Sequence, residues 1–256
     1  MSKLVFKKPK AIKDDYRFTY CPGCDHGVAI RIIAEALEEM ELCEKTIIVS
    51  SIGCSVFLND YFDLDIIEAP HGRALAVATG VKRAKPDKFV LTYQGDGDFA
   101  SIGLGESLHA IARGENVTTV CINNTTYGMT GGQGGPTTVL GQITSTTPQG
   151  RKAEVHGYPI KIAELCAVLE GAGYVARTSL DSSAQIENTK KAIKKAFEIQ
   201  ENGLGASLVE VLATCPTNWK LSPQDSHKRV KEELFKIFPL GVYKHSFSRT
   251  HSREQH

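Results

Sequence analysis

The sequence predicts an α/β fold, in which helices cover both faces of a mostly parallel sheet. Short apolar runs typical of buried strands alternate along the chain with longer segments whose apolar residues recur at helical spacing. This alternation implies right-handed crossovers between parallel strands. A length of 256 residues with 41% hydrophobic residues is enough for one sizeable domain. No internal repeat or low-complexity linker divides it, so we expect residues 1–256 to form a single domain with a C-terminal tail.

Each element is predicted from its local pattern. Apolar residues recur every three or four positions across 28–42, which predicts the first helix, and 72–83 is a further helix rich in small residues. The other elements continue the alternation of helix and strand patterns. The predicted helices are 28–42, 72–83, 104–112, 162–169 and 184–199, and the predicted strands are 46–51, 89–93, 117–122, 174–178 and 208–212, of which 208–212 is expected to be the last strand.

One long stretch, 123–157, has no clear period and is rich in glycine, threonine and proline. It is too long for an ordinary connection, which favours a functional loop. The glycines around Gly131 favour a mobile lid, with a plain flexible surface loop as the alternative.

Charge and composition exclude several classes of function. The net charge of +1 gives no electrostatic case for binding nucleic acid or an anionic membrane, and the basic residues near each end are interpreted as solvated tails. No apolar run approaches the ~20 residues of a membrane helix, and the N-terminus lacks the apolar region of a secretory signal. We therefore expect a cytoplasmic protein whose seven cysteines are reduced or metal-bound. The early basic cluster is Lys3, Lys7, Lys8 and Lys10.

Polar clusters follow two successive strands. The strand 89–93 runs into a Gln-Gly-Asp-Gly-Asp segment that contains Asp96, and the next strand ends at a pair of asparagines that includes Asn124. Both clusters should lie at the carboxyl edge of one sheet. Carboxylate, amide and backbone carbonyl oxygens suit Mg²⁺, which takes its remaining ligands from phosphates and water. The glycines allow close approach of a diphosphate, and the following helix N-terminus favours the anion.

Two other interpretations of these residues exist. Gly95, Gly97 and Ala100 fit a loose dinucleotide-binding fingerprint, but that motif needs an acidic residue after the next strand, where this chain has asparagines. A plain turn would also explain Asp and Asn. The pairing of both clusters, one strand apart, favours metal and diphosphate.

Four cysteines form a second candidate site. Cys21 and Cys24 form a C-x-x-C motif before the first helix, while Cys54 and Cys215 each follow a predicted strand. Four thiolates gathered at the sheet edge could bind a [4Fe–4S] cluster or a structural zinc ion. A thioredoxin-like redox pair is weakened because no βαβ segment precedes the motif. The remaining cysteines are interpreted as buried small hydrophobes: Cys43, Cys121 and Cys166.

In combination, these motifs resemble one family. The segments YCPGCDHG, SSIGCS, HGRA, GDGD, NNTTYGMTGGQ and CPTNWK occur in this order over roughly residues 16–243. Together they resemble the β subunit of 2-oxoacid:ferredoxin oxidoreductases, which implies a thiamine-diphosphate-binding domain of the pyrophosphate type. The resemblance implies that Asp96, Asn124 and the carbonyl of Thr126 hold Mg²⁺. It further implies that Cys21, Cys24, Cys54 and Cys215 hold a [4Fe–4S] cluster, and that the cofactor contacts are Ile52, Gly53, Cys54, Ser55, His71, Gly72, Gly95, Gly97, Asp98, Gly128 and Met129, although His71 could equally be a structural histidine.

The resemblance also implies a reaction and partners. The expected activity is coenzyme A-dependent oxidative decarboxylation of a 2-oxoacid to an acyl-CoA and CO₂, with electrons passing through the cluster to ferredoxin. The glutamate that activates thiamine is expected on a partner α subunit, so we assign no catalytic residue here and do not assign Glu106. Onward electron transfer needs a small ferredoxin-like subunit or a soluble ferredoxin.

The substrate remains open between two classes. Some relatives carry a lysine where this chain has Gly131, and loss of that charge favours a branched-chain 2-oxoacid. An arginine on the α subunit could instead select 2-oxoglutarate, and pyruvate is third. Two other functions compete with this one: a non-oxidative thiamine-dependent decarboxylase or synthase subunit with structural or zinc-bound cysteines, and a C-x-x-C binding module without thiamine.

Overall fold

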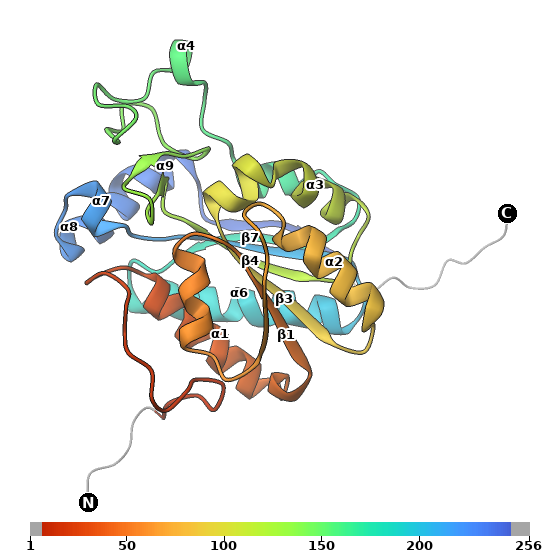
Figure 1. The fold of residues 1–256 in the computed structure, drawn as a ribbon. Helices are drawn as coiled ribbons and strands as arrows, with labels where there is room; N and C mark the ends of the chain where they lie inside the picture. The colour runs from red at the N-terminus through yellow and green to blue at the C-terminus, as the bar shows by residue number, and fades with distance from the viewer. Residues whose placement is uncertain (1–6, 247–256) are drawn as a thin grey trace, which may run out of the picture.

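The computed structural model describes residues 7–246, which form a seven-stranded sheet with the order β2-β1-β3-β4-β8-β7-β9 (Figure 1). Neighbouring strands are parallel, except that β9 is antiparallel to β7. This confirms the predicted mostly parallel sheet. The strands are β1 Thr46–Ser50, β2 Asp65–Glu68, β3 Phe89–Gly95, β4 Thr118–Asn123, β7 Ala172–Ser179, β8 Ala206–Leu212 and β9 Gly241–His245.

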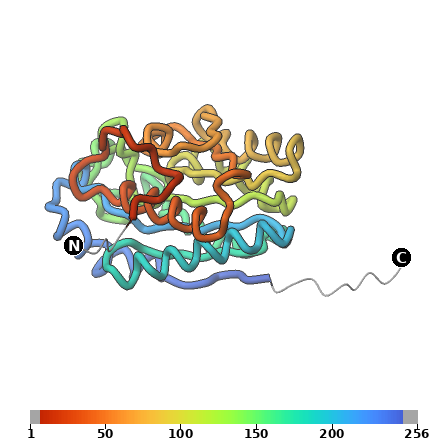
Figure 2. The backbone as a smooth tube through the Cα atoms, turned by 90° about the horizontal axis from the view of Figure 1, so that it is seen from below, coloured from red at the N-terminus to blue at the C-terminus, as the bar shows by residue number. Residues whose placement is uncertain are grey.

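Helices cover both faces of this sheet, as predicted. One buried cluster joins α1 and α6 to one face, and a second joins α2, α3 and α5 to the other. The paired helices α1 and α6 run side by side in Figure 2. Burial on both faces explains why the central strands are nearly continuous apolar runs. The bounds are α1 His26–Glu39, α2 Ala74–Ala84, α3 Leu104–Ala112, α5 Ile162–Ala167 and α6 Ser183–Glu201.

Both edge strands were missed by the sequence pattern. β2 and β9 are largely exposed or half-buried, so neither shows the apolar run that reveals a buried strand. The prediction that 208–212 is the last strand is therefore wrong, because β9 follows it. The short helical elements were also not predicted: η1 Cys43–Lys45, η2 Cys54–Asp60, η3 Asp98–Ile102, α4 Ala153–His156, α7 Pro216–Trp219, α8 Pro223–Arg229, η4 Val230–Leu234 and α9 Phe235–Ile237.

The aperiodic stretch forms an arm that projects beside the sheet and carries α4 at its tip (Figure 1). Its base is a two-stranded ladder of β5 Thr126–Tyr127 and β6 Gln133–Gly134. The buried guanidinium of Arg151 donates hydrogen bonds to backbone carbonyls on both sides of the arm, including Gly135 at 2.9 Å and His156 at 3.0 Å. These hydrogen bonds fix the backbone of the arm, and Val139 packs the arm against a small apolar cluster with Leu212 and Val230.

The described lysines near the start agree with the interpretation of a solvated basic segment. Lys7, Lys8 and Lys10 are exposed, and Lys8 pairs with Asp14. Lys3 and the tail after residue 246 lie outside the described residues. Within 7–246, no helix has both the length and the apolar character needed to cross a membrane.

Candidate cofactor and cluster site

Most of the predicted cofactor residues line one pocket of about 100 Å³ at the carboxyl ends of β1, β3 and β4. Of the predicted set, Gly72, Cys21, Cys24 and Cys215 do not line it. Three residues that sequence reasoning missed do: His26, Tyr127 and Thr130. The predicted residues that line it are Ile52, Gly53, Cys54, Ser55, His71, Gly95, Asp96, Gly97, Asp98, Asn124, Thr126, Gly128 and Met129.

The carboxyl of Asp96 is buried in this pocket directly after β3. It accepts a hydrogen bond from Thr137 on the arm and another from the backbone N–H of Gly97. Burial, with a smaller contribution from the negative charge of Glu210, raises the pKa of Asp96 to about 7. A buried carboxyl whose ionised form is this disfavoured is suited to a bound cation.

The second polar cluster lies against the first. A methyl group on Gly97 would overlap the ring of Tyr127, so only glycine lets the two turns meet this closely. The side-chain oxygen of Asn124 accepts a hydrogen bond from the backbone N–H of Thr126 at 3.2 Å. The indole N–H of Trp219 holds the backbone carbonyl of Asn124 at 3.1 Å. The predicted oxygen donors are therefore assembled at one edge of the sheet.

Asp98 holds the turn that carries His71. One oxygen of Asp98 lies 2.6 Å from Nδ1 of His71 and accepts the backbone N–H of Gly72 at 2.6 Å. The other oxygen accepts a hydrogen bond from Gln94 at 2.6 Å. Gly72 does not line the pocket, but its backbone N–H binds Asp98. Its φ of +76° is a backbone conformation that favours glycine. The Asp98 carboxylate therefore fixes the orientation of the His71 imidazole, which lines the pocket.

The four predicted cysteines lie beside this pocket. A methyl group built on Gly128 would lie 3.4 Å from the sulfurs of both Cys54 and Cys215, which are therefore no more than about 6.8 Å apart, twice that distance. Burial raises the pKa of the Cys24 thiol to about 12, with smaller contributions from the nearby Cys215 and Cys54. Burial also raises the pKa values of Cys54 and Cys215, and Cys21 contributes to both increases. The four thiols are thus close enough to one another to interact electrostatically.

Asp25 joins the C-x-x-C turn to the segment that carries Cys215. Its carboxylate accepts the backbone N–H of Thr214 at 2.8 Å and lies 3.0 Å from Nε2 of His227. The Thr214 hydroxyl in turn donates to the carbonyl of Gly23 at 2.7 Å. Sequence reasoning missed this anchor, although Asp25 directly follows the motif.

No three side chains of the metal-binding types surround a single ion position anywhere in residues 7–246. The other cysteines largely match expectation, since Cys121 and Cys166 are fully buried and Cys43 is half-buried against the core. Glu106, which we did not assign, forms an ion pair with Arg73 at 2.9 Å and does not line the pocket.

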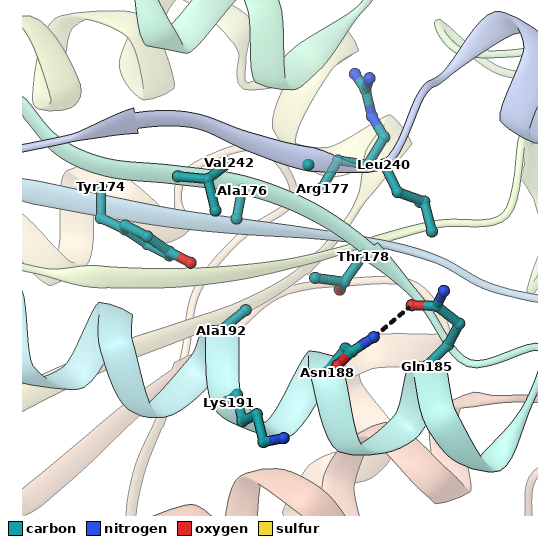
Figure 3. A pocket seen from close by; sticks show the side chains of 11 residues that line it. Tyr174, Ala176, Arg177, Thr178, Gln185, Asn188, Lys191, Ala192, Leu240 and Val242 are labelled. Atoms are coloured by element: carbon teal, nitrogen blue, oxygen red, sulfur yellow. Dashed lines mark hydrogen bonds between the residues drawn. The ribbon is translucent and has the colours of Figure 1, made fainter.

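A larger cavity of about 400 Å³ lies beside β9, a lateral edge strand of the sheet (Figure 3). It is bounded by β7, β9 and α6, and none of the predicted site residues lines it. Size alone therefore does not identify the candidate site, which rests on the convergence of the predicted residues.

Comparison with known proteins identifies the family. Residues 51–211 match the family described as thiamine pyrophosphate enzyme, C-terminal TPP binding domain. The chain is 41% identical over 215 residues to the 2-oxoglutarate synthase subunit KorB of Archaeoglobus fulgidus, which covers 84% of this chain and 76% of that subunit. The chain belongs to the thiamine-binding subunits of the 2-oxoacid:ferredoxin oxidoreductase family. The resemblance seen in the sequence is confirmed.

A second relative is longer than this chain. The ketoisovalerate oxidoreductase subunit VorA of Methanothermobacter thermautotrophicus is 42% identical over 253 residues, which are 95% of this chain and 53% of that subunit. The chain thus spans about half the length of that relative. Among solved structures, the 2-oxoglutarate:ferredoxin oxidoreductase of Magnetococcus marinus, with 2-oxoglutarate, coenzyme A and succinyl-CoA bound, matches with a TM-score of 0.78 and 28% identity. The match covers 96% of this chain and 87% of that one.

Proposed function

We propose that this chain binds magnesium thiamine diphosphate and a [4Fe–4S] cluster as part of an enzyme that oxidatively decarboxylates a 2-oxoacid. One observation carries the proposal: the buried, poorly ionised carboxyl of Asp96 shares a pocket with the oxygens of Asn124 and Thr126, beside four cysteines. Asp96, Asn124 and the carbonyl of Thr126 would hold Mg²⁺, which suits oxygen ligands and takes the rest from phosphate and water.

The family of the chain, rather than the spacing of the thiols, supports a cluster over zinc. Four cysteine thiolates can hold either group. Zinc does not change its oxidation state, whereas an oxidoreductase that reduces ferredoxin, as the name of the Magnetococcus marinus relative describes, needs a group that does. Cys21, Cys24, Cys54 and Cys215 would be the ligands, and Cys54 also lines the cofactor pocket.

The pocket size supports a partner chain. About 100 Å³ is well below the ≈ 300–1,000 Å³ of typical small-molecule sites. This chain would therefore supply the diphosphate side of the site, and a second chain would enclose the remainder. The longer VorA relative, of which this chain covers 53%, agrees with a need for additional polypeptide. We assign the missing activating glutamate to that partner.

The residues of this chain bind and orient rather than transfer protons. When bound, thiamine diphosphate would act as the electron sink that permits loss of CO₂ from the 2-oxoacid. The two electrons released would leave one at a time through the cluster to ferredoxin, while coenzyme A takes the acyl group. Asp98 fixes the His71 ring at the pocket, and Gly97 allows the close approach that brings the metal ligands together.

The pocket favours a substrate with an apolar side chain. Among the described lining residues there is no lysine or arginine to meet a second carboxylate. Gly131 stands where some relatives have lysine, and its φ of +109° would strain a lysine there. We therefore infer a branched-chain 2-oxoacid as the substrate.

The test is a 2-oxoacid panel with the anaerobically purified complex of this chain and its partner, coenzyme A and a low-potential acceptor. We expect a 2-oxoisovalerate-type substrate to give the highest kcat/KM. A preference for 2-oxoglutarate would overturn the substrate proposal alone. Release of CO₂ and aldehyde without reduction of the acceptor would overturn the oxidoreductase in favour of a non-oxidative decarboxylase.

A further inference from the structure

The turn that carries the proposed magnesium ligands is strained. Thr125, between Asn124 and Thr126, has a φ of +60°. This left-handed conformation is rare for any residue other than glycine and a genuine outlier for a β-branched one. Thr125 is also fully buried, and its hydroxyl has no hydrogen-bond partner. Strain of this kind persists only where the surrounding structure imposes it, and it concentrates at functional sites.

Three side chains, one at the end of β4 and two on the arm, impose this conformation. The side-chain oxygen of Asn123 accepts the backbone N–H of Thr125 at 3.2 Å. On the other side, the hydroxyl of Thr138 and the amide of Gln142 donate to the Thr125 carbonyl, at 2.6 and 3.3 Å. The carbonyl is therefore held by the arm, and the N–H is held by Asn123.

Asn123 is itself fixed by buried charges. Its amide nitrogen donates to Glu210 on β8 at 2.7 Å. The other carboxylate oxygen of Glu210 accepts from Nε of Arg177 on β7 at 2.9 Å and from the backbone N–H of Ala163 at 3.1 Å. Both charged side chains are fully buried.

Arg177 connects this network to the edge of the sheet. Figure 3 shows its guanidinium pointing away from α6, on the opposite side of β7 from Thr178. There it also pairs with Glu164 and donates to the Tyr243 hydroxyl at 2.7 Å. A continuous chain of contacts therefore runs from β9 through the sheet to residues 123–126, the turn that carries the proposed magnesium ligands and is called the metal turn below.

We propose that Asn123 and Glu210 are positioning residues, which hold Thr125 in its strained conformation and so aim Asn124 and Thr126 at Mg²⁺. The inference rests on the proposed function, since it concerns the same metal site. It adds a role for two buried polar side chains that do not line the pocket. A carboxylate inside the sheet is costly unless it is paired and hydrogen-bonded, and here its partners orient the turn.

The test measures the Mg²⁺ concentration that half-saturates thiamine diphosphate binding, by equilibrium dialysis of the complex with its partner. Asn123→Ala should raise that concentration about tenfold, because one restraint on the strained turn is lost. Adding Thr125→Gly should restore it to within about threefold of the wild-type value, because glycine adopts this φ without strain. Asn116→Ala is the matched control, since it removes a comparable side-chain hydrogen bond at 2.8 Å to Gln200, remote from the turn.

Each outcome supports or overturns the positioning role. A structural role alone would lower the unfolding temperature of Asn123→Ala while leaving its Mg²⁺ requirement at the wild-type value, which would overturn the inference. A double variant that needs as much Mg²⁺ as Asn123→Ala would overturn it too. Asp96→Ala separates the positioning role from the proposed function. If Asp96→Ala loses thiamine diphosphate binding while Asn123→Ala binds it with the wild-type Mg²⁺ requirement, only the positioning role fails. Wild-type protein that binds no magnesium thiamine diphosphate would remove the proposed function as well.

Discussion

The metal turn and the cysteine group lie side by side but are built differently. Around the cofactor pocket, carboxylates fix the turns: Asp98 accepts three hydrogen bonds that hold the turn of His71, and Glu210 accepts the hydrogen bond from Asn123 beside the metal turn. Around the cysteines, the backbone is anchored by Asp25, while among the described side chains only Asn218 donates to one of the four sulfurs, that of Cys215. The metal turn is thus preorganised by its own hydrogen bonds, whereas burial raises the pKa values of the Cys24, Cys54 and Cys215 thiols and so favours their neutral form.

The largest expected effect is loss of the metal. Asp96→Ala should abolish Mg²⁺-dependent binding of thiamine diphosphate, because it removes the only carboxylate among the proposed magnesium ligands. Equilibrium dialysis at saturating Mg²⁺ measures it, with exposed Asp87→Ala as the matched control. Normal binding of thiamine diphosphate by the Asp96 variant would contradict the assignment of Asp96 as a magnesium ligand.

Cys215→Ser should affect the cysteine group and leave the metal turn intact. The variant should lose more than half of its iron and labile sulfide, because the cluster loses one of four thiolates, while magnesium thiamine diphosphate binding survives. Metal analysis of anaerobic protein is the measurement. Cys43→Ser, at a half-buried cysteine outside the group, should retain full iron. Equal iron in both variants would remove Cys215 from the ligand set.

Removing the charge of Arg177 should show how much the buried ion pair behind the metal turn contributes to the free energy of unfolding. Arg177→Met leaves Glu210 buried without its ion-pair partner, so the free energy of unfolding should fall by about 3–5 kcal/mol. The exposed pair of Lys195 and Glu198 serves for comparison, because Lys195→Met should cost no more than about 1 kcal/mol. Denaturant unfolding would contradict this view of Glu210 if the two variants were equally stable.

The cysteine side should show a pH dependence through His26. Burial lowers the pKa of His26 from 6.5 to about 4, and its Nδ1 lies 2.6 Å from the Tyr93 hydroxyl. Below pH 6.5 the unfolded chain therefore takes up a proton that the folded chain refuses, so stability falls as the pH drops towards 4. Between pH 7 and 4.5 this histidine should contribute a loss of about 2.5 kcal/mol.

The variant His26→Gln isolates that contribution. Because glutamine does not titrate, its stability should fall less over the same range, as measured by urea unfolding at both pH values. Parallel pH profiles for the variant and the wild type would show that His26 is not the group responsible.

Sequence predicted most of the buried fold and most of the residues that line the candidate pocket, for physical reasons that differ by region. Strands buried on both faces are visible as apolar runs, and parallel strands bring their ends to one edge, so Asp96 and Asn124 could be placed together from the sequence alone. Edge strands such as β9 carry no such pattern. Tyr127 and His26 were missed because they enter the pocket through close packing, which no spacing rule reveals. The left-handed φ of Thr125 was equally invisible, since threonine gives no local signal for it.

The central claim is that one edge of the sheet holds both the metal-anchored cofactor and the cluster. The direct measurement is reduction of the iron–sulfur chromophore when 2-oxoacid and coenzyme A are added anaerobically, without ferredoxin, to the complex of this chain and its partner. We predict rapid reduction that requires both Mg²⁺ and thiamine diphosphate and that is lost in Cys215→Ser. Substrate turnover with the iron still oxidised, or protein containing zinc in place of iron and sulfide, would contradict it.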